Sequence, residues 1–226
     1  LVRQRYDNLS EEQTEYQIND RLSFQKFLGL TLSDSVPDQK TIWLFREVLI
    51  RRGEVKKLFR RFEKHLNDAG LMGREGKIID ASFVDVPRQR NSREENEEIK
   101  QGTVPESFQQ NENQREQKDV AARWAKKGAE GHYGYKNHVK ADRTTKLIED
   151  YEVTDASVHD SQVVEDLVET GDGILHADSA YTGEAIETIL EEHGVKGEIC
   201  EKGYRNHPLT TAQRKRNRKK SKIRVR

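Results

Sequence analysis

A run of ten residues, Lys77 to Val86, has the composition of a buried β-strand but carries an aspartate, Asp80, in its middle. Valine, isoleucine and phenylalanine favour strands, whereas aspartate is depleted there and costly to bury without a partner. Such a strand needs a sheet to pair with and a group that compensates the charge. Two interpretations are open: Asp80 points to water, or it is a metal-binding or catalytic carboxylate held on a rigid element.

The composition excludes several classes of protein. The chain of 226 residues is polar, with 33% hydrophobic and 35% charged side chains, yet it is long enough for one good core. It contains no apolar stretch near the roughly 18 residues that span a membrane, and no signal peptide. A single cysteine, Cys200, excludes an internal disulfide and a zinc finger and fits a reducing cytosol. We therefore expect a cytoplasmic protein with no membrane partner.

The net charge of zero hides a separation of charge along the chain. Residues 202–226 hold eleven Lys and Arg side chains and no Asp or Glu, which leaves 29 basic and 40 acidic side chains in residues 1–201. A basic block of this kind either binds a polyanion such as nucleic acid, through phosphate contacts and counterion release, or is a solvated end. Both interpretations are open at this point.

Residues 1–72 are expected to form a small helical domain. Ser10 and Gln13 have the spacing of a capping box, and Asp20 and Asp38 are candidate N-caps of two further helices. Apolar residues between positions 55 and 66 then recur at helical spacing. Short helices of this kind fit DNA binding of the helix-turn-helix type, and equally a bundle without that role.

Residues 88–119 contain almost no apolar side chains. Such a segment is a linker, a disordered loop or an exposed helix. Because strand-like sequence lies on both sides, we interpret it as an insertion within one domain that covers residues 73–201.

The segments after the insertion predict the fold class. Residues 135–142 and 146–154 are expected to be the two strands of a hairpin. The elements predicted next are a helix at 160–169, a strand at 174–181, a helix at 184–193 and a short strand at 197–200. With the strand at Lys77, three antiparallel strands precede alternating helices and strands, which predicts an α/β fold with a mixed sheet.

A second aspartate, Asp178, lies in the strand predicted at 174–181. In open α/β sheets, functional sites form outside the carboxyl ends of strands. If the strands that carry Asp80 and Asp178 are neighbours, the two carboxylates repel, so that either one is protonated or cations neutralise them. Magnesium suits such a site, since it prefers oxygen ligands and binds through one or two carboxylates plus substrate phosphate.

Five segments follow one another along the chain: SFQKFLGLTLSDSVPDQKTIWLFREVL, IIDASFVDVPRQRN, HYGYKNHVKAD, VTDASVHDSQ and ILHADSAYTGE. In this order they resemble the DDE transposases of prokaryotic insertion sequences, in the IS-five-like group. Five ordered pieces are far more specific than any one of them, and the resemblance covers nearly the whole chain. It implies an RNase H-like catalytic domain with Asp80 on the first strand and Asp178 on the fourth.

The resemblance also implies the reaction, which is phosphoryl transfer on double-stranded DNA. Water attacks a phosphodiester at the end of the element, and the freed 3′-hydroxyl then attacks target DNA. Two divalent ions, Mg²⁺ or Mn²⁺, would be bound by Asp80 and Asp178, with Asp80 bridging them. A homo-oligomer at the nucleoid is expected, because the reaction handles two DNA ends.

The family also uses a glutamate on a later helix, and residues 202–226 contain no acidic side chain. In relatives, the alternation that here reads KSKIRVR runs directly into Val-Glu-His. We therefore expect a chain shortened at its C-terminus, whose basic segment 202–226 leads to a final helix that is missing.

Other polar residues are candidates for contact with DNA or for support of the metal ligands. Lys136 and His138 are two residues apart and therefore share one face of the predicted strand. We expect this face to lie beside the site and both side chains to contact phosphate, although polar residues on an exposed sheet face would give the same pattern. Contacts with the DNA backbone are expected from Arg205, Arg214, Lys215, Arg216, Arg218, Lys219 and Lys220. Support of the metal ligands is expected from His159, Asp160 and His176. For His159 and Asp160 we favour the alternative that they form a helix cap, and His176 is alternatively a core residue. Trp124 either stacks on an extruded base or, as we favour, packs under the insertion.

Two alternatives to a transposase are open. A metal-dependent nuclease without strand transfer would share the pair of aspartates, and it would fail to join a cleaved 3′ end to target DNA. A catalytically inactive DNA-binding remnant would fit the absence of a third carboxylate, and it would bind DNA without cleaving it.

Overall fold

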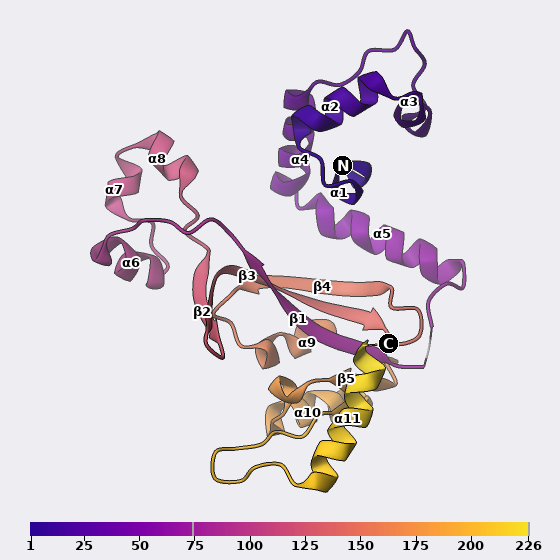
Figure 1. Cartoon of the computed structure of the whole chain (residues 1–226), viewed down its shortest axis with the longest axis vertical. Coiled ribbons are helices and arrows are strands. Elements are labelled where there is room, and N and C mark those ends of the chain that lie inside the picture. The colour runs from indigo at the N-terminus through magenta and orange to yellow at the C-terminus, as the bar shows by residue number, and fades with distance from the viewer. Residues whose placement is uncertain (74, 226) are drawn as a thin grey trace. The chain divides into compact units, whose positions relative to one another are not determined.

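The computed structural model describes residues 1–73 and 75–225. The chain divides into two compact units, Leu1–Lys64 and His65–Arg226 (Figure 1). The first unit is helical, and the second is built around a β-sheet.

Helices of the first unit begin largely where the sequence predicts them. They are α1 (Val2–Tyr6), α2 (Glu11–Asp20), α3 (Leu22–Leu28), α4 (Gln39–Arg51) and α5 (Glu54–Asp68), the last of which continues into the second unit. The predicted capping box is present, since Ser10 and Gln13 exchange both hydrogen bonds. Asp38 caps α4 by accepting a backbone N–H at 2.7 Å. The prediction for Asp20 is wrong, because Asp20 ends α2 and Arg21 is the N-cap of α3.

A six-stranded mixed sheet forms the second unit. Its strands are β1 (Lys77–Asp85), β2 (Arg123–Lys127), β3 (Glu130–Asp142), β4 (Ile148–Asp155), β5 (Ile174–Ala177) and β6 (Lys196–Ile199). Strand β1 lies between β3, which is antiparallel to it, and β5, which is parallel; β6 is parallel to β5, and both β2 and β4 pair with β3 in antiparallel fashion. This arrangement confirms the predicted α/β class and is consistent with an RNase H-like fold.

Helices and 3₁₀ turns connect these strands, and one further helix, α11, follows the last strand. They are α6 (Arg93–Lys100), α7 (Glu106–Gln109), α8 (Glu112–Gln117), η1 (Asp160–Val163), α9 (Val164–Leu167), η2 (Ser179–Tyr181), α10 (Glu184–Glu192) and α11 (Thr211–Val225). Of the three interpretations left open for residues 88–119, exposed helices fit best, because α6, α7 and α8 lie there and bury few apolar side chains, among them Ile99 and Phe108. Within the described residues, no helix has the length and apolar composition needed to cross a membrane.

One face of the sheet carries the hydrophobic core of this unit. Ile79 of β1 and Leu175 of β5 are fully buried there, in one cluster with residues of α9 and α10. Successive side chains of a strand point to opposite faces, so Asp80 lies on the other face. Helix α11 packs against β5 (Figure 1), and its Arg224 reaches Asp80.

Several elements differ from the prediction. The strand predicted at 174–181 ends at Ala177, and residues 179–181 form the 3₁₀ turn η2. The sequence does not predict β2, because the run RWAKK holds one large apolar side chain, Trp124, which is 54% exposed. This strand depends on its pairing with β3, which a local pattern does not reveal. The helix predicted at 160–169 is instead the 3₁₀ turn η1 followed by α9, which ends at Leu167.

Replacing Asp142 with asparagine is expected to destabilise the second unit in a pH-dependent way. Asp142 is fully buried at the end of β3 and accepts hydrogen bonds from the backbone N–H groups of Thr144 (3.0 Å) and Thr145 (2.6 Å). Burial acts to raise the pKa of this carboxyl, but the bonds from Thr145 and Thr144 and the charge of Lys77 lower the pKa below its usual value. A carboxyl with a lowered pKa stabilises the folded state above its unfolded pKa, and this contribution is lost as pH falls through the folded pKa.

Urea unfolding at pH 7 should therefore show that Asp142→Asn lowers the free energy of unfolding by about 1–3 kcal/mol. The difference between variant and wild type should shrink at pH 3. An equal difference at both pH values would contradict the assigned charge effect.

Candidate active site

The two predicted catalytic aspartates lie at the same level of neighbouring strands. Strands β1 and β5 are parallel, and their paired residues, such as Ile78 and His176, are offset by 98 positions. The same offset places Asp178 opposite Asp80, one residue after the end of β5. Because neighbouring strands lie about 4.8 Å apart, the sheet brings the two residues together.

The carboxylate of Asp80 is accessible and forms an ion pair with an arginine side chain. Its side chain is 58% exposed, and its Oδ2 accepts a hydrogen bond from Nη2 of Arg224 at 2.8 Å. Its Oδ1 accepts the backbone N–H of Ala81 at 3.0 Å. The arginine supplies the charge compensation that an aspartate within a strand needs.

Asp178 stands where β5 ends and η2 begins. Its Oδ1 accepts the backbone N–H of Ala180 at 2.7 Å, so Asp178 is the N-cap of η2. This bond uses one carboxylate oxygen and holds the side chain at the carboxyl end of the strand, where sites of α/β sheets form.

Arg224 and Tyr181 both respond to the charges of this site. Burial acts to lower the pKa of Arg224, but its hydrogen bond to Asp80 and the charges of Asp80 and Asp178 raise the pKa above the usual value. Burial is the main cause of the raised pKa of the Tyr181 phenol, followed by the charges of Asp160, Asp80 and Asp178. Arg224 therefore stays charged beside Asp80, and the phenol of Tyr181, buried in the hydrophobic core cluster, stays protonated.

His176 lies on the same sheet face as Asp80, because its partner in β1 is Ile78. The residue is 3% exposed, and neither ring nitrogen has a hydrogen-bond partner within the described part of the chain. Burial, followed by the positive charge of Arg143, lowers the pKa of the ring. A neutral buried ring fits packing on this face of the sheet, where α11 covers β5, and not a place in the hydrophobic core on the other face.

Lys136 and His138 lie on the opposite face of the sheet from Asp80. Asp80 of β1 pairs with Val139 of β3, and paired residues point to the same face of a sheet. The face that holds Asp80 therefore holds the odd-numbered residues of this part of β3, whereas positions 136 and 138 point to the other face. The expectation that both side chains lie beside the site is therefore wrong. His138 is fully buried, and Lys136 donates to Asp160 at 2.8 Å. Neither side chain is free to hold phosphate.

The turn η1 supplies the next two candidates. His159 is its N-cap, with Nδ1 accepting the backbone N–H of Ser161 at 3.3 Å, as the favoured interpretation has it. Asp160 accepts from Lys136, and its charge acts on Tyr181. The geometry gives both residues local roles, because Asp160 pairs with Lys136, which lies on the sheet face opposite Asp80.

Helix α11 divides its basic residues between two faces. Arg216 pairs with Glu201 at 2.7 Å, Lys220 donates to the Ile199 carbonyl at 2.8 Å, and Arg224 holds the site carboxylate. Arg216 and Lys220 are thus engaged within the protein, which corrects their expected availability for DNA. The exposed cations whose side chains form no hydrogen bond or ion pair with any other described residue are called the outer basic stripe: Arg214, Lys215, Arg218, Lys219 and Lys222.

The basic segment 202–226 is therefore a loop and a helix, with residue 226 outside the described residues. Arg205 lies in the exposed loop that precedes α11. The sequence prediction missed Arg224 as part of the site. The signal for Arg224 was present, since positions 216, 220 and 224 share one face of a helix.

The donor chemistry of the site is that of hard oxygen ligands. Asp80 and Asp178 offer carboxylate oxygens, which suit Mg²⁺ or Mn²⁺. Among residues 1–73 and 75–225, no group of three or more His, Cys, Asp or Glu side chains is placed to hold a metal ion. The residues present fit a divalent ion as a pair of ligands.

Family models match both parts of the chain. A model described as Transposase DDE domain matches residues 72–226, which include the whole sheet and both aspartates. A model described as Transposase domain (DUF772) matches residues 1–48. No solved structure matches the chain.

Proposed function

Because the chain belongs to the family of transposases with a DDE domain, enzymes that cleave and join DNA, we propose that its catalytic carboxylates are Asp80 and Asp178. The observation that supports this proposal is the register of β1 and β5, in which Ile78 pairs with His176 and which, continued by two residues, leads to Asp80 and Asp178. Placement in the IS-five-like group stays a prediction.

The two carboxylates would hold a pair of divalent ions, Mg²⁺ or Mn²⁺. Such ions activate the attacking oxygen and stabilise the leaving oxygen when bound. Asp80 suits this role because its carboxylate is accessible, and Asp178 suits it because the Ala180 N–H fixes its orientation. Arg224 compensates the charge of Asp80 within the protein.

The partner is double-stranded DNA, and the outer basic stripe is the surface that would bind its backbone. Cationic side chains that already form ion pairs within the protein add little to DNA affinity, whereas contacts of exposed, unpaired cations with phosphate add affinity by releasing counterions. The stripe lies on the helix whose inner face holds Asp80, so DNA on α11 lies near the carboxylates. A homo-oligomer is proposed because two DNA ends must be joined, with the protein acting at the nucleoid in the cytoplasm.

The test is a strand-transfer assay with the protein, Mg²⁺ or Mn²⁺, and DNA fragments that end in the terminal repeats of the element. We expect cleavage at the repeat ends and joining of the new 3′ ends to a target plasmid. Cleavage without joining would instead favour a nuclease, and binding without cleavage would favour an inactive DNA-binding protein.

Neutralising the outer basic stripe is expected to weaken DNA binding at every sequence. The triple variant Arg214→Gln, Arg218→Gln and Lys222→Gln should lower the slope of log affinity against log salt by about 3, since each lost phosphate contact lowers it by about 1. Fluorescence anisotropy of a labelled duplex over a range of salt measures this slope. The matched control on the same helix is Arg216→Gln, whose side chain pairs with Glu201 and should change the slope by less than 1. A triple variant with the slope of wild type would contradict the assigned surface.

A further inference from the structure

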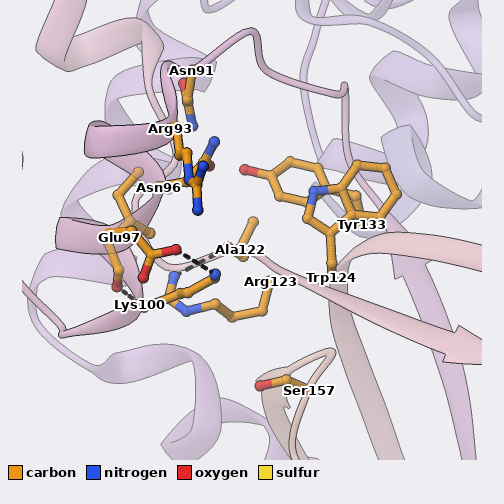
Figure 2. Close-up of a pocket in the computed structure, with 11 residues that line it drawn as sticks. Asn91, Arg93, Asn96, Glu97, Lys100, Ala122, Arg123, Trp124, Tyr133 and Ser157 are labelled. Carbon is orange, nitrogen blue, oxygen red and sulfur yellow. Dashed lines mark hydrogen bonds and ion pairs between the residues drawn. The ribbon is translucent and has the colours of Figure 1, made fainter.

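A cavity of about 720 Å³ lies between the polar insertion and the sheet of the second unit. One wall is aromatic and comes from β2 and β3, while the other is polar and comes from the start of the insertion and α6 (Figure 2). Its volume is in the range of pockets that enclose small organic ligands. None of the residues assigned to the catalytic site lines it.

The aromatic wall consists of Trp124 and Tyr133. Their ring centres are 5.2 Å apart and the rings are tilted by 41°. Tyr133 is buried, but Trp124 is 54% exposed even though it contacts this ring. The guanidinium of Arg88 lies 5.2 Å from the centre of the Trp124 ring. An exposed indole with a cation beside it offers a surface for a planar ring, by stacking and cation–π attraction.

The polar wall offers a donor, an acceptor and a cation. Lys118 donates to the amide oxygen of Asn91 at 2.6 Å, which leaves the Asn91 amide nitrogen as a donor. The amide nitrogen of Asn96 donates to the backbone at 2.8 Å, which leaves its oxygen as an acceptor. Arg93 is exposed, and its side chain makes no hydrogen bond or ion pair with the other described residues. Figure 2 shows the Tyr133 hydroxyl pointing across the cavity toward Arg93 and Asn96.

The place of the cavity relative to Asp80 fits a DNA strand. Strand β1 runs five residues from Asp80 to Asp85, which pairs with Gly134, the neighbour of Tyr133. Five strand residues span about 16 Å, and one DNA strand advances about 3.4 Å per nucleotide. The cavity therefore lies within reach of a nucleotide about five positions from the scissile phosphate.

We propose that this cavity binds one unpaired nucleotide of the DNA substrate. The base stacks on Trp124, its polar edge meets the amides of Asn91 and Asn96, and its phosphate meets Arg93. The inference rests on the proposed function, because it requires DNA at Asp80. Stacking on an aromatic ring suits any base, so the site selects unpaired DNA over duplex without selecting sequence.

The test compares affinities for an eight-nucleotide single strand and for the matching duplex, measured by anisotropy. Trp124→Ala should weaken binding of the single strand about tenfold, as expected for the loss of one stacked base, and leave duplex binding within twofold. Trp124→Phe should restore most of the lost affinity, since it keeps a ring. The matched control is Trp43→Ala, which removes the other tryptophan, a partly exposed one in the first unit. Equal losses on both DNAs, or no loss on either, would overturn the proposal.

A second readout does not depend on removing the ring. The chain has two tryptophans, so the Trp43→Phe variant reports the fluorescence of Trp124 alone. Addition of the single strand should quench this emission, whereas the duplex should leave it unchanged. An unquenched Trp124 in a protein that binds the single strand would rule the site out. If duplex binding and cleavage persist in that case, the proposed function is retained and only the nucleotide site is rejected. A protein that binds no DNA at all would contradict both the proposed function and the nucleotide site.

Discussion

Asp80→Asn and Asp178→Asn are each expected to lower DNA cleavage by at least about a thousandfold while leaving DNA affinity within about threefold. Asparagine keeps the size of the side chain but loses the negative charge that would hold a divalent ion. The Asp178→Asn variant retains an oxygen for the Ala180 N–H, so its local geometry should persist. Cleavage of labelled terminal-repeat DNA, together with transposition frequency in cells, measures the effect.

The matched control lies on the same strand. Asp85 is five residues from Asp80, its side chain is 62% exposed, and it contacts His132 at 3.2 Å. Asp85→Asn therefore removes a carboxylate from β1 without touching the pair and should retain cleavage. Cleavage at the wild-type rate in either Asp80→Asn or Asp178→Asn would reject the assignment of the catalytic carboxylates.

Gly134→Ala is expected to destabilise the second unit by about 3 kcal/mol or more. Gly134 has φ +147°, a conformation that side chains rarely adopt, and an added Cβ would lie 2.2 Å from the Val84 carbonyl oxygen of β1. It pairs with Asp85 of β1 and with Arg123 of β2, so movement to relieve the clash would disturb two strand pairings at once. Urea unfolding followed by circular dichroism measures the loss.

Gly131→Ala is the control on the same strand. Gly131 has no positive φ, and an added Cβ would make an ordinary contact with Trp124 at 3.6 Å. Its free energy of unfolding should change by less than about 0.5 kcal/mol. Similar effects at positions 131 and 134 would show that the close approach of β1 and β3 is not what requires glycine.

Local sequence patterns were sufficient to predict the elements whose structure depends on residues close together along the chain. The capping box at Ser10, the cap at Asp38 and the hairpin of β3 and β4 all follow from such patterns, as does the run of apolar residues in β1. Strand β2 does not follow, because its polar residues gain order only from pairing with β3. The short η1 and α9 replace one predicted helix for a similar reason, because tertiary packing decides how many residues with helical spacing form an α-helix.

The sequence by itself determined the fold class, the family resemblance and the two aspartates of interest, because each depends on residue type and order along the chain. Only the tertiary structure decided which side chains face the pair. The pairing of β1 with β3 puts Lys136 and His138 on the wrong face, and the docking of α11 brings Arg224 to Asp80. Strand alternation and helix periodicity fix which residues share a face, but which face meets which neighbour depends on contacts between distant segments.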